Sequence, residues 1–126
     1  MKTLIQYLIT LFTFKPELSP TSIALIKAKE LISAEENWTK HCIAKDKNGF
    51  PCTVNSPDAV AYCASGAIRK VSKPFVSALK AIKYLNKAAY PKTLIALNDS
   101  SSTSHEDVME MFDKAIELSI KDTIKQ

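Results

Sequence analysis

Uncharged polar residues recur at helical spacing through residues 3–14, a segment that is otherwise apolar. On a helix they form one narrow stripe, and the remaining apolar arc covers about 220° of the circumference. So wide an arc needs cover, and we therefore expect residues 1–15 to form a helix that packs centrally or meets its copy in a homodimer. A secretory signal is the alternative, although no small-residue cleavage site follows the segment. The polar positions are Thr3, Gln6, Thr10 and Thr13.

Two serine–proline pairs predict helix starts in the next part of the chain. Serine caps a helix by accepting a backbone N–H, and proline suits the first helical position. Ser19-Pro20 therefore predicts a helix that continues to about Ala34. Ser56-Pro57-Asp58 predicts another, whose small-residue face includes Cys63 and Gly66 and permits the close approach of a neighbouring helix.

The following helix carries a dense run of lysines. The pattern predicts that it opens near Lys73-Pro74 and extends to about Ala88. The positions that we expect to face the core are Phe75, Leu79, Ile82 and Leu85–Asn86. The lysines of its outer side are Lys80, Lys83 and Lys87.

The last helix begins with a predicted capping box. Thr103 or Ser104 caps it and Glu106 or Asp107 completes the box, because these groups satisfy free backbone amides of the first turn. The apolar arc of this helix is wider than contact with one neighbouring helix covers. One flank of the arc therefore either contacts a partner protein or is buried in a deeper groove of this domain. The expected inward positions are Val108, Phe112, Ala115, Ile116 and Ser119, and the flanking apolar positions include Met109, Met111 and Leu118.

These patterns together predict a mainly α fold in a single domain, residues 1–126. Two glycines are too few for a many-turned β fold. The polar run 45–49 predicts a turn between two short extended pieces, which gives a possible short β-hairpin near 42–54. We expect a compact bundle of about five helices, with residues 20–118 as its core.

Charge is distributed unevenly along the chain, whose formal net charge is +4. Residues 59–98 carry seven basic residues and no acidic one, whereas residues 99–126 carry seven acidic residues and three lysines. Either the two segments neutralise each other or the basic segment meets an acidic partner. Nucleic acid bound by residues 69–92 is one such partner, although arginine is scarce and no groove-reading motif is present.

The three cysteines, an odd number, argue against a secreted disulfide framework. We expect free thiols, no metal and no other cofactor, because no Cys-x-x-Cys pair occurs. Free thiols indicate a cytoplasmic location, either the bacterial cytoplasm or, for a translocated effector, the host cytosol. A nucleophilic set of Cys63, His105 and Asp99 is conceivable, but Cys63 is expected within a helix, where nothing lowers its pKa. We therefore assign no catalytic residue and expect no enzyme activity.

Several short motifs resemble a family of small bacterial domains of unknown function. The resemblance spans residues 24–118, but Tyr62 and Leu97 stand where the family commonly has tryptophan. It implies, as one alternative, a small-molecule-binding or hydrolytic domain that uses Trp38, Asp46, Asn98 and Asp99. The motifs are Trp38-Thr39, Asp46, Gly49, Asp58-Ala59-Val60, Cys63, Gly66-Ala67, Asn98-Asp99, His105 and Phe112-Asp113.

The chain's size, its lysine-rich composition and its lack of catalytic motifs also resemble the small helical Legionella inhibitors of the ubiquitin-modifying effectors MavC and MvcA. This resemblance implies a non-enzymatic protein that binds a larger transglutaminase or deamidase and covers its ubiquitin-binding surface or its active-site cysteine. Inhibition of such an enzyme is our first functional expectation, ahead of ligand binding and nucleic-acid binding. The expected contact residues are Lys80, Lys83, Lys87, Met109, Met111 and Leu118.

Overall fold

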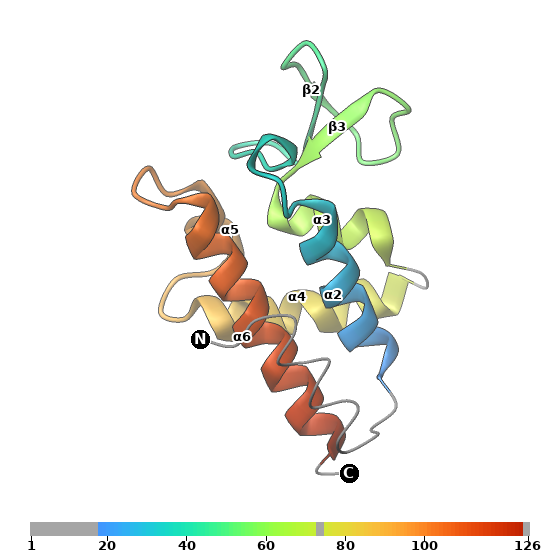
Figure 1. The fold of residues 1–126 in the computed structure, drawn as a ribbon, viewed down its shortest axis with the longest axis vertical. Helices are drawn as coiled ribbons and strands as arrows, with labels where there is room; N and C mark the ends of the chain where they lie inside the picture. The colour runs from blue at the N-terminus through green and yellow to red at the C-terminus, as the bar shows by residue number, and fades with distance from the viewer. Residues whose placement is uncertain (1–17, 73–74, 125–126) are drawn as a thin grey trace.

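The computed structural model describes residues 18–72 and 75–124. Segment 3–14, for which we expect a dimer-forming helix, lies outside this part of the chain. Figure 1 shows the helices gathered into one body, with a small β-sheet at one end of it. The mainly α class with a short β element, predicted from the sequence, is confirmed.

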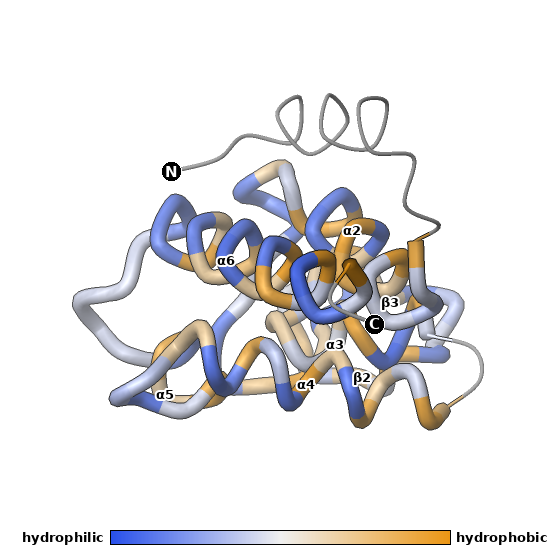
Figure 2. Tube along the Cα trace, turned by 90° about the horizontal axis from the view of Figure 1, so that it is seen from below, coloured by the Kyte–Doolittle hydropathy of each residue, from blue (hydrophilic) through white to orange (hydrophobic). Residues whose placement is uncertain are grey.

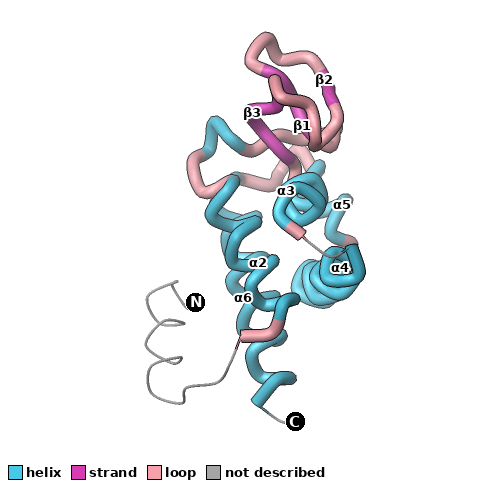
Figure 3. The backbone as a smooth tube through the Cα atoms, turned by 90° about the vertical axis from the view of Figure 1, so that its right-hand side faces the viewer, coloured by secondary structure: helices cyan, strands magenta, loops and turns pink. Residues whose placement is uncertain are grey.

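Five α-helices and one 3-10 turn make up the helical body of the described chain. The longest helix, α6, packs against both α2 and α4, and α2 also packs against α3 (Figure 3). None of the described helices is both long and apolar enough to cross a lipid bilayer. In chain order the elements are α2 (Pro20–Leu31), η1 (Glu35–Asn37), α3 (Ala64–Val71), α4 (Phe75–Ala89), α5 (Leu94–Asp99) and α6 (His105–Ile124).

The apolar face of α2 and the predicted inner face of α6 form the centre of the core. Between them, the hydroxyls of Ser22 and Ser119 share a buried hydrogen bond of 2.7 Å. At the edge of the same contact, the ammonium of Lys29 pairs with the carboxylate of Asp113. The fully buried apolar side chains here are Leu25 and Ala28 of α2, Ile32 at its C-terminal cap, and Val108, Phe112, Ala115 and Ile116 of α6.

The capping box of α6 uses Ser104 and Asp107. The Ser104 hydroxyl accepts the Asp107 N–H at 3.2 Å, and an Asp107 carboxylate oxygen accepts the Ser104 N–H at 2.9 Å. The backbone N–H and the hydroxyl of Ser104 lower the pKa of the Asp107 carboxyl. The predicted start of this helix is therefore confirmed, with one of the alternative pairs selected.

The small sheet consists of β1 (Ala44–Asp46), β2 (Pro51–Cys52) and β3 (Ala59–Tyr62), in the order β2-β1-β3 and antiparallel throughout. The hairpin of β1 and β2 confirms the one predicted near 42–54. Its turn is held by Asp46, whose carboxylate accepts the N–H groups of Asn48 at 2.9 Å and Phe50 at 3.0 Å. Asp46 thus acts as a turn-forming residue, as aspartate commonly does.

The helix predicted to start at Ser56-Pro57-Asp58 begins later in the structure, so its predicted start is wrong. The Ser56 hydroxyl accepts the Asp58 N–H in a local turn, and β3 follows before the helix begins at Ala64. Pairing of Tyr62 with Ala44 of β1 buries the Tyr62 side chain to 5% exposure, so sheet formation overrides the start signal. The residue that caps α3 is Cys63, whose sulfur accepts the Gly66 N–H.

Gly66 lies where the β1 side of the sheet meets α3. A Cβ atom at this position would lie 2.0 Å from the backbone oxygen of Ile43. At Gly66 this helix accommodates the backbone of residue 43, while α3 also packs against α2, the close helix contact expected from the sequence.

The face that α4 turns to the core differs in part from the predicted one: Leu85 is buried as predicted, but Asn86 is exposed. Phe75 and Leu79, expected inside, are 68% and 54% exposed, whereas Ile82 is partly buried against the core. The alanine-rich face allows α4 to pack closely against α2 and α6. Both stripes repeat at helical spacing, so the period alone does not distinguish them. The inward residues of α4 are Ser77, Ala78, Ala81, Leu85, Ala88 and Ala89.

Candidate functional site

Asn98, at the end of α5, is the centre of a buried polar network and is only 2% exposed. Its side-chain oxygen accepts the Trp38 indole N–H at 2.8 Å and the Ala64 N–H at 3.0 Å. Its amide nitrogen donates to the Thr39 carbonyl at 3.2 Å and to the Asp99 carboxylate at 2.8 Å. All the hydrogen-bonding groups of this amide are thus used to hold three chain segments together.

Asp99 fastens the segment that leads into β1. Its Oδ1 atom accepts the His41 N–H at 2.9 Å in addition to the Asn98 amide. His41 has φ = 68°, a conformation in which a residue other than glycine costs free energy, so the Asp99 contact helps to stabilise it. The Oδ2 atom of Asp99 accepts no hydrogen bond from the described residues.

Lys40 joins the same segment to the loop between α5 and α6. Its ammonium donates to the carbonyl oxygens of Ser100 at 2.6 Å and Thr103 at 2.7 Å. It also lies 5.4 Å from the centre of the Trp38 ring, within the range of a cation–π contact. Lys40 therefore stabilises the end of α5, where carbonyl groups lack helical partners.

His105 also contacts Trp38. The two ring centroids are 5.7 Å apart, and the His105 Nε2 atom lies 2.7 Å from the carbonyl oxygen of Ile32. The sequence motifs Trp38, Asn98, Asp99 and His105 are thus brought together as parts of a structural junction. Trp38 meets Asn98, as the ligand-binding alternative requires, but through a hydrogen bond in this network.

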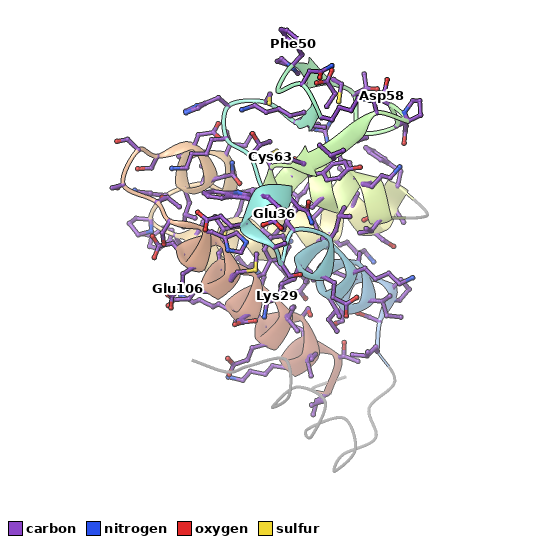
Figure 4. All side chains as sticks on the ribbon, turned by 45° about the horizontal axis from the view of Figure 1, so that its top comes forward. Lys29, Glu36, Phe50, Asp58, Cys63 and Glu106 are labelled. Carbon is purple, nitrogen blue, oxygen red and sulfur yellow. The ribbon has the colours of Figure 1, made fainter. Side chains whose placement is uncertain are left out.

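A cavity of about 220 Å³ lies beside this junction, between α3, α5 and residues 41–43. Cys63 stands at its edge, where the sheet meets the helical body (Figure 4). Tyr62 and Leu97, the positions that depart from the family pattern, do not line this cavity. Both side chains contact the hydrophobic core. The presence of Tyr62 and Leu97 where the family commonly has tryptophan therefore changes the packing of the core. The residues that carry polar or thiol side chains around the cavity are His41, Cys42, Cys63, Ser65, Arg69, Asn98 and Asp99.

Cys63 is poorly suited to nucleophilic attack. Burial raises the pKa of its thiol, and the nearby Asp99 carboxylate adds to the rise, while the N–H groups of Gly66 and Ser65 oppose it. His105 does not line the cavity, so the nucleophilic set of Cys63, His105 and Asp99 is not assembled. The three cysteines are free thiols, and no group of three metal-ligating side chains forms within residues 18–72 and 75–124.

Two features of the cavity were missed in the sequence. Ser65 and Arg69 lie four residues apart on α3, so they share one side of that helix, and both line the cavity. The predicted helix contained both residues, but nothing in the sequence shows that a cavity lies against this side of it. His41 was also missed, because nothing in the sequence indicates its left-handed conformation.

A second candidate surface is the outer side of α4. Phe75, Val76 and Leu79 are 68%, 53% and 54% exposed, and Lys80, Lys83 and Lys87 are exposed beside or beyond them. In Figure 2 the first turn of α4 shows the hydrophobic colour where the helix begins. We call the surface formed by Phe75, Val76, Leu79, Lys80 and Lys83 the α4 face.

The predicted contact residues of α6 are not exposed in the same way. Met111 is 3% exposed and belongs to the core, so its side chain is not a surface anchor and that assignment is corrected. Met109 is partly buried against the core, and Leu118 is also partly buried. The flank of α6 beside these residues therefore contributes mainly to packing within this chain.

The basic and acidic segments do not neutralise each other through ion pairs in the part of the chain that the structure describes. The pairs formed there join Lys29 to Asp113 and Lys121 to Glu117. A hydrogen bond from the Tyr84 hydroxyl to Asp122 does connect α4 with α6, and the Lys87 ammonium lies 5.5 Å from the centre of the Tyr84 ring. Lys80 and Lys83 are left facing solvent.

Comparison with known proteins gives one match. The sequence matches a family of unknown function, DUF6197, over residues 17–118. No curated protein and no solved structure matches the chain. The match covers the junction around Asn98, the cavity beside it and the α4 face. The chain therefore belongs to the DUF6197 family.

Proposed function

We propose that this chain is a non-enzymatic protein-binding module that docks through the α4 face onto an acidic surface of a larger enzyme. The observation that carries the proposal is the exposure of Phe75, Val76 and Leu79 on one helix face with lysines alongside. Large apolar side chains grouped on a surface mark interaction sites more often than scattered ones do. An exposed apolar surface with lysines alongside suits a partner whose surface is apolar at its centre and acidic at its edge.

The two kinds of residue have different roles in docking. Aromatic and aliphatic anchors at the centre of an interface supply most of the binding free energy, which suits Phe75 and Leu79. Lys80 and Lys83 lie on the same helix and attract an acidic surface over longer range. Such charges increase the association rate more than the final affinity, and salt weakens their effect.

The kind of partner comes from the resemblance to small effector inhibitors. We propose a ubiquitin-modifying transglutaminase or deamidase of the MavC and MvcA type, inhibited when this chain covers its ubiquitin-binding surface. Such an enzyme exposes a broad surface for ubiquitin, and a small helical protein is able to occupy it. The free chain is proposed to be a homodimer through residues 3–14, which sedimentation of the free protein tests directly.

The test measures binding and inhibition together. The full chain is titrated against a MavC-type enzyme, with binding followed by interferometry and activity by modification of ubiquitin. Phe75→Ser with Leu79→Ser should weaken binding and inhibition by about tenfold or more, because apolar anchors are lost. Lys80→Glu with Lys83→Glu should slow association and reduce its dependence on salt.

Phe50→Ser is the matched control. Phe50 is 66% exposed, close to the 68% of Phe75, but it lies at the tip of the sheet (Figure 4). This variant should bind and inhibit as the unchanged chain does. Absence of binding at micromolar concentration contradicts the proposed partner, and undiminished binding by the Phe75 and Leu79 variant contradicts the proposed surface.

Nucleic-acid binding through residues 69–92 receives less support from the geometry. Arg69 lines the cavity, and the side chain of Lys87 lies over Tyr84. Binding to many unrelated nucleic-acid sequences, with steep weakening by salt, would favour this function over docking to a protein.

A further inference from the structure

The cavity beside Asn98 has the size and the walls of a small-ligand site. Its volume of about 220 Å³ equals that of about seven water molecules at their liquid volume. Ile43, Leu94 and Ile95 give it apolar walls, and polar side chains converge on it from α3 and α5. A concave apolar space with a few converging polar groups is typical of sites for small molecules.

Ser65 gives the cavity an unused polar group. The residue is 8% exposed and lines the cavity, and its hydroxyl forms no hydrogen bond with the described residues although it is not closed off from solvent. A hydroxyl that is open to a cavity is able both to donate and to accept a hydrogen bond there. The Ser65 hydroxyl is therefore placed to bond a molecule in the cavity.

The cavity carries opposite charges at its two ends. Asn98, which precedes Asp99, bonds to the first residue of α3, so Asp99 lies near the start of that helix. Arg69 lies five residues further along α3, about 7 Å along the helix axis. Arg69 forms no ion pair with any described residue, and Asp99 keeps its Oδ2 atom free of hydrogen bonds from them. The cavity thus runs from a carboxylate at one end to a guanidinium at the other.

The amide groups at the start of α3 do not serve as an anion site. The Ala64 N–H is bonded to Asn98, and the Gly66 N–H is bonded to the Cys63 sulfur. An anionic group in this cavity would also be repelled by Asp99 if it lay near the helix start. Its favourable place is at Arg69 and Ser65, four residues apart on one side of α3.

We propose that this cavity binds a free α-amino acid with an aliphatic side chain. The carboxylate of the ligand pairs with Arg69 and accepts a hydrogen bond from the Ser65 hydroxyl. Its ammonium group lies against Asp99 Oδ2, and its side chain packs against Leu94 and Ile95. The site is independent of the α4 face, so neither proposal depends on the other.

The experiment titrates L-leucine, L-valine and L-isoleucine into the isotopically labelled full chain and follows backbone amide resonances. Saturable shifts should concentrate in residues 41–43, 63–69 and 94–99 for at least one of them. Two analogues of leucine separate the charged ends: 4-methylpentanoate lacks the ammonium group, and 3-methylbutylamine lacks the carboxylate. Each should bind more weakly than leucine, because each loses one of the two charged contacts.

Variants assign each end of the ligand. Arg69→Gln should weaken binding of leucine and 4-methylpentanoate by about tenfold or more, and leave the amine unaffected. Asp99→Asn keeps the Oδ1 acceptor of the network and should weaken leucine and the amine instead. Ser65→Ala should weaken leucine and 4-methylpentanoate but not the amine. Lys70→Gln is the control, because Lys70 is exposed on α3 and does not line the cavity.

Two results would overturn the proposal. One is the absence of saturable shifts with all three amino acids at about 10 mM, a concentration that largely fills a site of millimolar Kd. The other is binding that responds equally to Arg69→Gln and Lys70→Gln, which would show attraction to surface charge alone.

Discussion

The indole N–H of Trp38 donates a hydrogen bond of 2.8 Å to the side-chain oxygen of Asn98, although 60 residues separate them along the chain. The same oxygen accepts the N–H of Ala64, the first residue of α3. One buried amide therefore connects the segment before the sheet, the start of α3 and the end of α5. These connections form one side of the cavity, so the stability of the fold and the shape of the candidate site depend on the same residue.

Replacement of Asn98 should be severe. Asn98→Ala leaves the Trp38 indole, the Ala64 N–H and the Thr39 carbonyl without their partner, in a place that is 2% exposed. We expect the free energy of unfolding to fall by about 3–4 kcal/mol, measured by urea denaturation. Asn48→Ala, in the exposed hairpin turn, is the control and should change it by about 0.5 kcal/mol or less. Equal effects of the two substitutions would contradict the role of the network.

The two glycines should respond differently to alanine. Gly66→Ala places a Cβ 2.0 Å from the Ile43 carbonyl oxygen, so backbone must move, and we expect a loss of more than about 2 kcal/mol. Gly49 has φ = 83° and nothing within 4 Å of its Cβ position, so Gly49→Ala should cost only the backbone strain, about 1 kcal/mol. Thermal unfolding of both variants checks this order, and a larger loss at Gly49 would contradict it.

The sequence pattern predicted helix starts correctly where they depend on residues within one turn and no distant contact overrides them. Ser19-Pro20 and the Ser104–Asp107 box define helix starts by bonds within one turn, and both were predicted. The start of α3 depends on pairing of Tyr62 with Ala44, a contact between residues 18 positions apart, which the local pattern does not contain. The prediction that Phe75 and Leu79 of α4 face the core was wrong for a related reason. Close packing of the α4 alanines against two other helices determines which side of α4 is buried.

The junction beside the cavity was predictable in most of its members but not in their roles, and Asp46, predicted with them, lies in the hairpin turn instead. Trp38, Asn98, Asp99 and His105 were identified from motifs, and they do meet. Their mutual hydrogen bonds, which make them structural, depend on three-dimensional arrangement. The exposed ends of the cavity are formed by residues that no motif had singled out, such as Arg69.

Asp107 should show the effect of the capping box in its titration. The backbone N–H and hydroxyl of Ser104 lower its pKa, so the stabilisation it gives is present above the ordinary aspartate pKa and is lost as the pH falls through the lowered value. Ser104→Ala removes the hydroxyl and should raise this pKa part of the way to its ordinary value, because the backbone bond remains. Carboxyl resonances followed from neutral to acidic pH measure the shift. A pKa unchanged by this substitution would contradict a contribution from the hydroxyl.

Tyr84 should titrate at unusually high pH. Its hydroxyl donates to the Asp122 carboxylate, and this hydrogen bond, with burial and the charge of Asp122, raises the pKa of Tyr84 to about 12. Because the folded value lies above the unfolded value of about 10, the stabilising contribution is complete below that pH and is lost as the pH rises through about 12. Asp122→Asn removes the charge and should lower the pKa of Tyr84 toward 10.

Absorbance of tyrosinate near 295 nm follows this titration, and Tyr84→Phe identifies the phase that belongs to Tyr84 among the four tyrosines. Asp107→Asn is the control, since that carboxyl contacts Ser104 at the far end of α6. If the high-pH phase survives in Asp122→Asn, the link between α4 and α6 through Tyr84 does not hold in solution. If it is lost there and retained in Asp107→Asn, that link holds α4, and with it the α4 face, against the last turns of α6.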